Sequence, residues 1–120
     1  MPYVQQHNYT PDFVLHNGII IELKGGSDSF VKRIHGRLVR LPSFDAESRG
    51  KMIRVKKQYP HLDIRFVFMS DGKLSTGKRC SDWCKKNGFP YHIGVDIPDS
   101  WLIEDGEIPP ELVKKVKNET

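Results

Sequence analysis

Short apolar runs separated by polar breaks dominate the start of the chain, and they predict β-strands. Residues 12–15 and 19–24 form two such runs, and Asn17-Gly18 lies between them. Asn-Gly is typical of a two-residue hairpin turn, because both central positions of that turn require a positive φ. The pattern therefore predicts an antiparallel hairpin with a two-residue turn.

The rest of the chain adds helices and further strands to this hairpin. Helices are indicated by capping residues at their ends, and strands by runs of β-branched or aromatic residues. The predicted elements are a helix over residues 44–59 with Ser43 as its N-cap, a strand over residues 63–69, a helix over residues 81–87 closed by Gly88, a strand over residues 91–93, and a terminal helix after Pro109-Pro110.

Residues 30–41 fit two different structures. Their apolar positions follow a helical period, whereas His35-Gly36 lies between two β-capable arms, residues 30–34 and 37–41. A glycine inside a helix costs about 1 kcal/mol relative to alanine. A basic hairpin is therefore favoured over a helix.

The order strand, strand, helix, strand, helix, strand indicates an α/β fold with a mixed β-sheet flanked by helices. With 120 residues the chain has room for one modest core, so residues 1–120 are expected to form a single domain. The chain has no signal-peptide pattern and no run near the roughly 20 apolar residues of a membrane span. Its two cysteines, Cys80 and Cys84, are too few for a disulfide framework and indicate a reducing, cytoplasmic setting.

The net charge of +4 conceals a strongly basic middle segment. Only Asp45 and Glu47 accompany the basic residues there, whereas acids outnumber bases from residue 96 onward. Such a segment fits binding to a polyanion, although a solvated helix face is an equally good interpretation. The candidate DNA-binding residues are Lys32, Arg33, Arg37, Arg40, Arg49, Lys51, Arg54, Lys56 and Lys57.

Three charged residues of the N-terminal hairpin converge in the predicted fold. The hairpin returns Asp12 to the far end of the second strand, where Glu22 and Lys24 share one face because they are two positions apart. Charges held against buried strands are costly, and a bound metal ion or substrate is a common reason for them. The alternative is that Asp12 caps a turn while Glu22 and Lys24 form an ordinary surface ion pair.

Pro11-Asp12, followed after a short hairpin by Glu22-Leu23-Lys24, is similar to the signature of the PD-(D/E)xK nucleases. Several separate blocks also resemble, in the same order, the bacteriophage endonuclease I family, whose members resolve four-way (Holliday) DNA junctions. The blocks are residues 9–15, 21–25, 57–68, 82–89 and 97–102, so the resemblance extends over about residues 2–102.

This resemblance implies a restriction-endonuclease-like fold and metal-dependent hydrolysis of phosphodiester bonds in branched DNA. By it, the catalytic residues are Asp12, Glu22 and Lys24. The resemblance also implies that the metal ligands are Asp12, Glu22 and the backbone carbonyl of Leu23. Such oxygen ligands favour Mg²⁺, with Mn²⁺ able to substitute, and the ion activates water and offsets charge on the phosphorane. The implied location is the cytoplasm of a phage-infected bacterium.

The sequence departs from the family at its N-terminus. Family members carry an N-terminal helix with one more catalytic glutamate, exchanged between the subunits of a dimer, whereas no acidic residue precedes Asp12 here. Residues 3–6 correspond to the bridge between subunits and are therefore the segment through which a homodimer would pair. Asp28 and Glu47 are candidate substitute acids, and His7 is a candidate substitute base.

The second departure is a basic insertion over residues 27–43, and an acidic-to-basic tail follows over residues 103–120. Two alternatives to junction cleavage therefore stay open. One is a mobile-element, homing-type or nicking PD-(D/E)xK endonuclease acting on duplex DNA. The other is a DNA-binding module that needs a partner chain for catalysis. The simultaneous presence of Asp12, Glu22 and Lys24 argues against a simple loss of catalysis.

Overall fold

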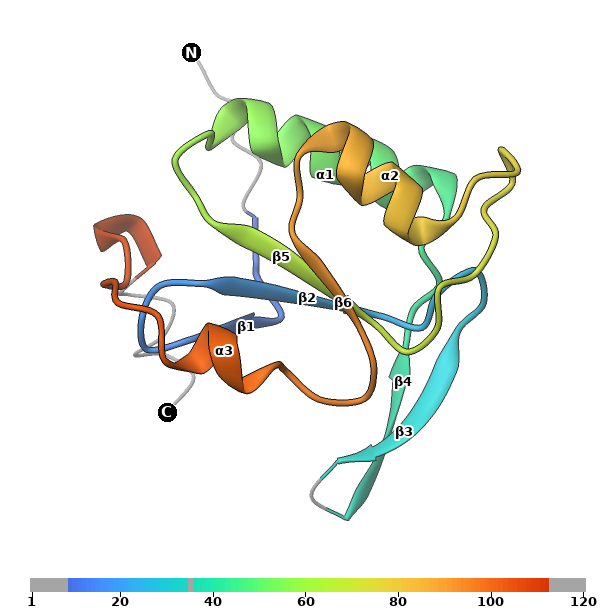
Figure 1. The fold of residues 1–120 in the computed structure, drawn as a ribbon, viewed down its shortest axis with the longest axis horizontal. Coiled ribbons are helices and arrows are strands. Elements are labelled where there is room, and N and C mark those ends of the chain that lie inside the picture. The colour runs from blue at the N-terminus through green and yellow to red at the C-terminus, as the bar shows by residue number, and fades with distance from the viewer. Residues whose placement is uncertain (1–8, 35, 113–120) are drawn as a thin grey trace.

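Four strands form the central sheet of the protein, in the spatial order β1-β2-β5-β6 (Figure 1). The computed structural model describes residues 9–34 and 36–112. The strands are β1 (Phe13–Val14), β2 (Ile20–Lys24), β5 (Ile64–Phe68) and β6 (Tyr91–Ile93). β1 runs antiparallel to β2, whereas β2, β5 and β6 are parallel. The sheet is mixed, which confirms the predicted α/β class.

Helices α1 (Ala46–Gln58) and α2 (Cys80–Asn87) cover one face of this sheet, and the short α3 (Asp99–Leu102) lies on the other side (Figure 1). α2 ends at Gly88, whose φ of 77° is the left-handed conformation that a glycine C-cap adopts, as predicted. The four-residue α3 was not predicted from the sequence.

The N-cap predicted for α1 was wrong. Asp45, not Ser43, caps the helix, and its side chain accepts a hydrogen bond of 2.8 Å from the backbone N–H of Ser48. Ser43 instead pairs with Gly26, and the backbone N–H of Phe44 donates to the Gly26 carbonyl at 2.8 Å. This pairing keeps residues 43 and 44 extended, so the helix begins only beyond them.

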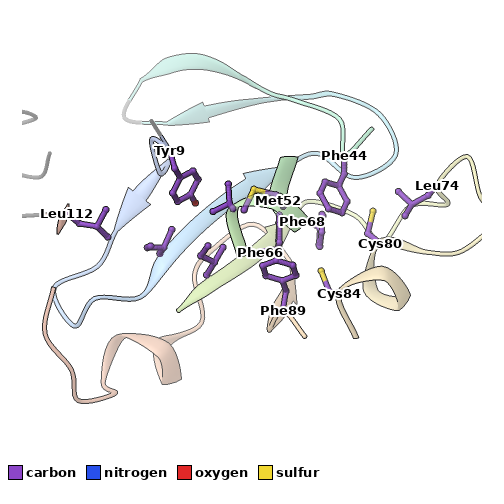
Figure 2. Close-up of a cluster of buried hydrophobic side chains, with 13 residues drawn as sticks. Tyr9, Phe44, Met52, Phe66, Phe68, Leu74, Cys80, Cys84, Phe89 and Leu112 are labelled. Carbon is purple, nitrogen blue, oxygen red and sulfur yellow. The ribbon is translucent and has the colours of Figure 1, made fainter. Parts of the chain in front are cut away.

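A large apolar core fills the space between the sheet and the two long helices (Figure 2). Phe44 lies at its centre, with ring centroids 5.1 Å from Phe66 and 5.3 Å from Phe68. Cys80 and Cys84 are fully buried in this core and are not joined by a disulfide. Buried thiols of this kind act as small apolar groups that fill the core.

A second, smaller core lies on the opposite face and attaches the C-terminal segment. Trp101 of α3 packs there, with the Arg65 guanidinium 5.2 Å from its ring centroid. Arg65 also forms two hydrogen bonds of 2.8 Å with the carboxylate of Glu104. Asn17, in the loop between β1 and β2, donates to the carbonyls of Trp101 at 2.8 Å and Glu104 at 2.9 Å. The C-terminal segment therefore holds the loop that precedes β2.

The loop between β1 and β2 is one residue longer than predicted. Leu15 and Ile19 close it with a backbone hydrogen bond of 2.8 Å, so residues 16–18 form a three-residue loop. Gly18 takes the left-handed position, with a φ of 89°, that such loops require. The extra residue shifts the register so that Phe13 pairs with Ile21. Asp12 is consequently opposite Glu22 and on the same side of the sheet, whereas a two-residue turn would place it opposite Leu23.

Residues 30–41 form a separate two-stranded sheet, which confirms the predicted hairpin. β3 (Phe30–Ile34) pairs with β4 (Arg37–Leu41) in antiparallel register, from Phe30↔Leu41 to Ile34↔Arg37. Gly36 has the positive φ, 80°, that the two-residue turn requires. The hairpin projects away from the central sheet beyond the end of β2 (Figure 1).

Residues 110–112 have helical conformation, and the rest of the predicted terminal helix falls outside the described residues. Within the described part of the chain, no helix has the length and apolar character needed to cross a membrane.

Candidate active site

Strand β2 places Glu22 and Lys24 on the face of the sheet that α1 covers. Ile20, two positions earlier on the same face, belongs to the large core, so this side of the strand is buried. Glu22 is only 5% exposed and Lys24 is partly buried. A carboxylate in such a position needs charged or hydrogen-bonded partners to offset its desolvation.

Asp12 joins these residues from the adjoining edge of the sheet. Its Oδ2 accepts a hydrogen bond of 2.9 Å from the backbone N–H of Leu23, directly between the two site residues of β2. The side chain is exposed to solvent. The structure thus brings together all three predicted catalytic residues, one carboxylate exposed and the other buried.

The charge of Glu22 is strongly disfavoured in this environment. Burial and the negative charge of Asp12 raise the pKa of Glu22 from its ordinary value of 4.5 to about 7, although Tyr9, Lys24 and Lys51 act in the opposite direction. A carboxyl group that titrates near neutrality is typical of functional sites, because a bound cation can then restore the charged form.

Tyr9 also contacts this site, although it was not among the residues predicted for it. Its hydroxyl donates a hydrogen bond to Oε2 of Glu22, and its ring is buried in the large core (Figure 2). Burial and the neighbouring Glu22 raise the pKa of the Tyr9 phenol, so it stays a donor. Tyr9 precedes Pro11-Asp12 by only two positions, and this spacing was the only sequence feature that pointed to it.

Lys51 is the second site residue whose place depends on tertiary structure. It lies on α1, and its ammonium group is close enough to Glu22 to lower the pKa of that carboxyl. In the sequence it was grouped with the basic run and assigned to DNA. Its position adds a positive charge near the buried carboxylate of Glu22.

The donor set suits a small divalent cation. Mg²⁺ is usually held by one or two carboxylates, with water molecules completing its shell, and Asp12 and Glu22 provide these carboxylates. The Ile20 N–H donates to the Asp63 carbonyl at 2.8 Å, and the Lys24 carbonyl accepts from the Met69 N–H at 3.1 Å. Both residues therefore direct their backbone groups toward β5. The alternating residue Leu23 therefore directs its N–H and carbonyl toward the β1 edge, where Asp12 lies. The predicted third ligand fits this arrangement.

Among the described residues, no three His, Cys, Asp or Glu side chains cluster tightly enough to hold a metal ion. Neither Asp28 nor Glu47 therefore joins Asp12 and Glu22 as a substitute acid in this structure. His7 and residues 3–6, the predicted bridge between subunits, lie outside the described residues.

The predicted DNA-binding residues lie on the β3–β4 hairpin and on α1, and two of those on α1 make internal contacts. Arg49 is buried, and its guanidinium donates to the Phe44 carbonyl at 2.7 Å and to Ser75 Oγ at 3.2 Å. Lys56 donates to the Gly88 carbonyl at 3.0 Å. The remaining residues are on the β3–β4 hairpin (Lys32, Arg33, Arg37 and Arg40) and on α1 (Lys51, Arg54 and Lys57).

The sequence is similar to a known protein family and to two characterised phage proteins. The model of a family described as phage endonuclease I matches residues 1–120. The chain is 34% identical over 122 residues to "Endonuclease I" of Escherichia phage T7, covering 96% of this chain and 70% of that protein. It is 36% identical over 125 residues to "Endodeoxyribonuclease 1" of Enterobacteria phage T3, covering 99% of this chain and 63% of that protein.

Proposed function

Because the chain belongs to the phage endonuclease I family, we propose that it is a metal-dependent endodeoxyribonuclease that hydrolyses phosphodiester bonds in branched DNA. The observation that carries the proposal is the meeting of Asp12 with the buried Glu22 at the edge of the sheet, beside Lys24. A protein that only binds DNA has no need for a buried carboxylate whose charge costs stability.

The chain's own residues divide the work of this reaction. Asp12, Glu22 and the Leu23 carbonyl would hold Mg²⁺, which supplies an activated water and neutralises charge on the phosphate. Tyr9 donates a hydrogen bond to Oε2 of Glu22, which restrains the orientation of the carboxylate. Lys24, on the same face as Glu22, stabilises the negative charge that develops on the phosphate oxygens.

The test compares Mg²⁺-dependent cleavage of an immobile four-way junction with cleavage of a linear duplex made from the same arms. We expect Lys24→Ala and Glu22→Gln each to lower the cleavage rate at least about 100-fold, since each removes charge stabilisation in the transition state. DNA binding is expected to change little. Lys85→Ala, an exposed lysine on α2, is the matched control and is expected to cleave normally.

The outcomes separate the candidate functions. Paired nicks in the junction alone support a junction-resolving nuclease. Nicking of both substrates supports a nuclease that acts on duplex DNA, such as one of a mobile element. Binding without cleavage supports a module that needs a partner chain. A fully active Glu22→Gln variant contradicts the proposed site.

A further inference from the structure

The β3–β4 hairpin has two different faces. Side chains alternate along each strand, so opposed residues of the two strands share a face. One face contains Leu41, which is buried, and Lys32, whose ammonium donates to the Val95 carbonyl of the main body. The other, which we call the outer face, is made of the cross-strand pairs Val31↔Arg40 and Arg33↔Leu38.

The outer face is exposed and combines apolar with cationic side chains. Leu38 is 67% exposed and Val31 is 49% exposed. Arg33 and Arg40, both exposed, are held by single hydrogen bonds within the hairpin, to the Gly36 carbonyl at 3.1 Å and to Ser29 Oγ at 3.0 Å. An arginine has five N–H donors, so these bonds orient each guanidinium without exhausting it.

The charge of the hairpin identifies the class of partner. Residues 29–41 contain four Lys or Arg residues and no Asp or Glu. A second copy of the same hairpin would carry the same charge and be repelled, whereas a phosphate backbone is complementary to it. A two-stranded ribbon of this kind also has the size to enter the major groove of duplex DNA.

The hairpin is anchored at its base, immediately beyond the catalytic lysine. The Gly25 N–H, next after Lys24, donates to the Pro42 carbonyl at 2.9 Å, and the Phe44 N–H donates to the Gly26 carbonyl at 2.8 Å. A Cβ on Gly25 would lie 2.4 Å from the Asp28 carbonyl oxygen, so only glycine fits this tight entry. Strands of this length extend about 15 Å, roughly half a turn of B-DNA, from that base.

We propose that the outer face of the hairpin binds a duplex arm of the DNA substrate, within about half a helical turn of the cleaved bond, through phosphate contacts of Arg33 and Arg40. The proposal rests on the proposed function for its substrate, and it adds the surface that holds the DNA. Leu38 and Val31 share this face with the two guanidinium groups, so bound DNA would cover all four side chains.

The test measures binding of labelled junction and linear duplex in EDTA by fluorescence anisotropy, at salt concentrations from about 50 to 200 mM. For Arg33→Gln/Arg40→Gln we expect the slope of log affinity against log salt to be shallower by about 2, because two phosphate contacts are lost. Arg33→Lys/Arg40→Lys keeps the charge and is expected to keep the slope. Lys85→Gln/Lys86→Gln removes the same charge from α2 and is also expected to keep it.

Thermal melts of all three variants establish that each is folded. An unchanged slope in Arg33→Gln/Arg40→Gln, or an equal change in the α2 control, overturns the proposal. If Arg33→Gln/Arg40→Gln loses self-association in sedimentation while its salt slope is unchanged, the outer face binds another copy of the chain. This result also overturns the proposal. Cleavage by the wild type is scored separately. If the wild type binds DNA through the hairpin and cuts nothing, the nuclease proposal fails and the hairpin proposal stands.

Discussion

Replacing Glu22 by glutamine is expected to stabilise the metal-free protein while it abolishes cleavage. Glutamine has almost the same shape, and its amide oxygen can still accept the hydrogen bond that Tyr9 donates to the carboxylate. What the substitution removes is a buried negative charge next to Asp12. The change therefore separates the electrostatic cost of the site from its packing.

The magnitude follows from the pKa of Glu22, which the fold raises from 4.5 to about 7. Each pKa unit corresponds to about 1.36 kcal/mol, so the ionised carboxylate costs about 3 kcal/mol in the folded protein. Below pH 4.5 Glu22 is protonated in both the folded and the unfolded state, and the cost is absent. Between pH 4.5 and about 7 only the folded state keeps its proton, so wild-type stability falls as the pH rises.

The measurement is urea unfolding of the wild type and Glu22→Gln in EDTA at pH 4 and pH 8. We expect nearly equal free energies of unfolding at the lower pH and a variant more stable by up to about 3 kcal/mol at the higher pH. Glu47→Gln, the same change at an exposed position of α1, is the control and should shift stability by no more than about 0.5 kcal/mol. A Glu22→Gln variant that is no more stable than the wild type at pH 8 would refute the electrostatic argument.

Three further predictions concern the metal ion and the C-terminal segment. Saturating Mg²⁺ is expected to raise the melting temperature of the wild type and leave that of Glu22→Gln nearly unchanged; equal shifts in both would exclude this site. Gly18→Ala is expected to lower the unfolding free energy by about 3 kcal/mol or more, because its Cβ would lie 2.2 Å from the Glu107 carbonyl oxygen in addition to the strained backbone. Gly36→Ala, which has a φ of 80° and open space around it, should lose only about 1–2 kcal/mol in the same chemical denaturation, and equal losses would contradict the clash. Glu104→Gln should destabilise the protein at neutral pH, and this difference should vanish as the pH falls through the folded pKa of Glu104, which Arg65 lowers; a pH-independent difference in thermal melts would contradict the ion pair.

The elements predicted correctly are those decided by local chemistry. Gly36 between two β-capable arms determined the basic hairpin, because its positive φ favours a turn and its presence disfavours a helix. Gly88 determined the end of α2 in the same way. The two-residue period of β2 determined that Glu22 and Lys24 share a face, since alternation is a property of the strand itself.

What the sequence left undecided depends on contacts between distant residues. Tyr9 reaches Glu22 only once the sheet and α1 enclose both, and the buried Arg49 donates a hydrogen bond to Ser75, 26 positions away. Ser43 had the right residue type for an N-cap, but its pairing with Gly26 moved the start of the helix to Asp45.

The hairpin of β1 and β2 shows most clearly which features depend on the local sequence and which depend on tertiary contacts. The sequence by itself determined that a turn occurs at Asn17-Gly18, because this dipeptide tolerates a positive φ. Only the tertiary structure decided that the loop has three residues, since Asn17 bonds to the carbonyls of Trp101 and Glu104, 84 and 87 positions away. That single extra residue places Asp12 on the same side as Glu22, so contacts made by the C-terminal segment help to assemble the site at the other end of the chain.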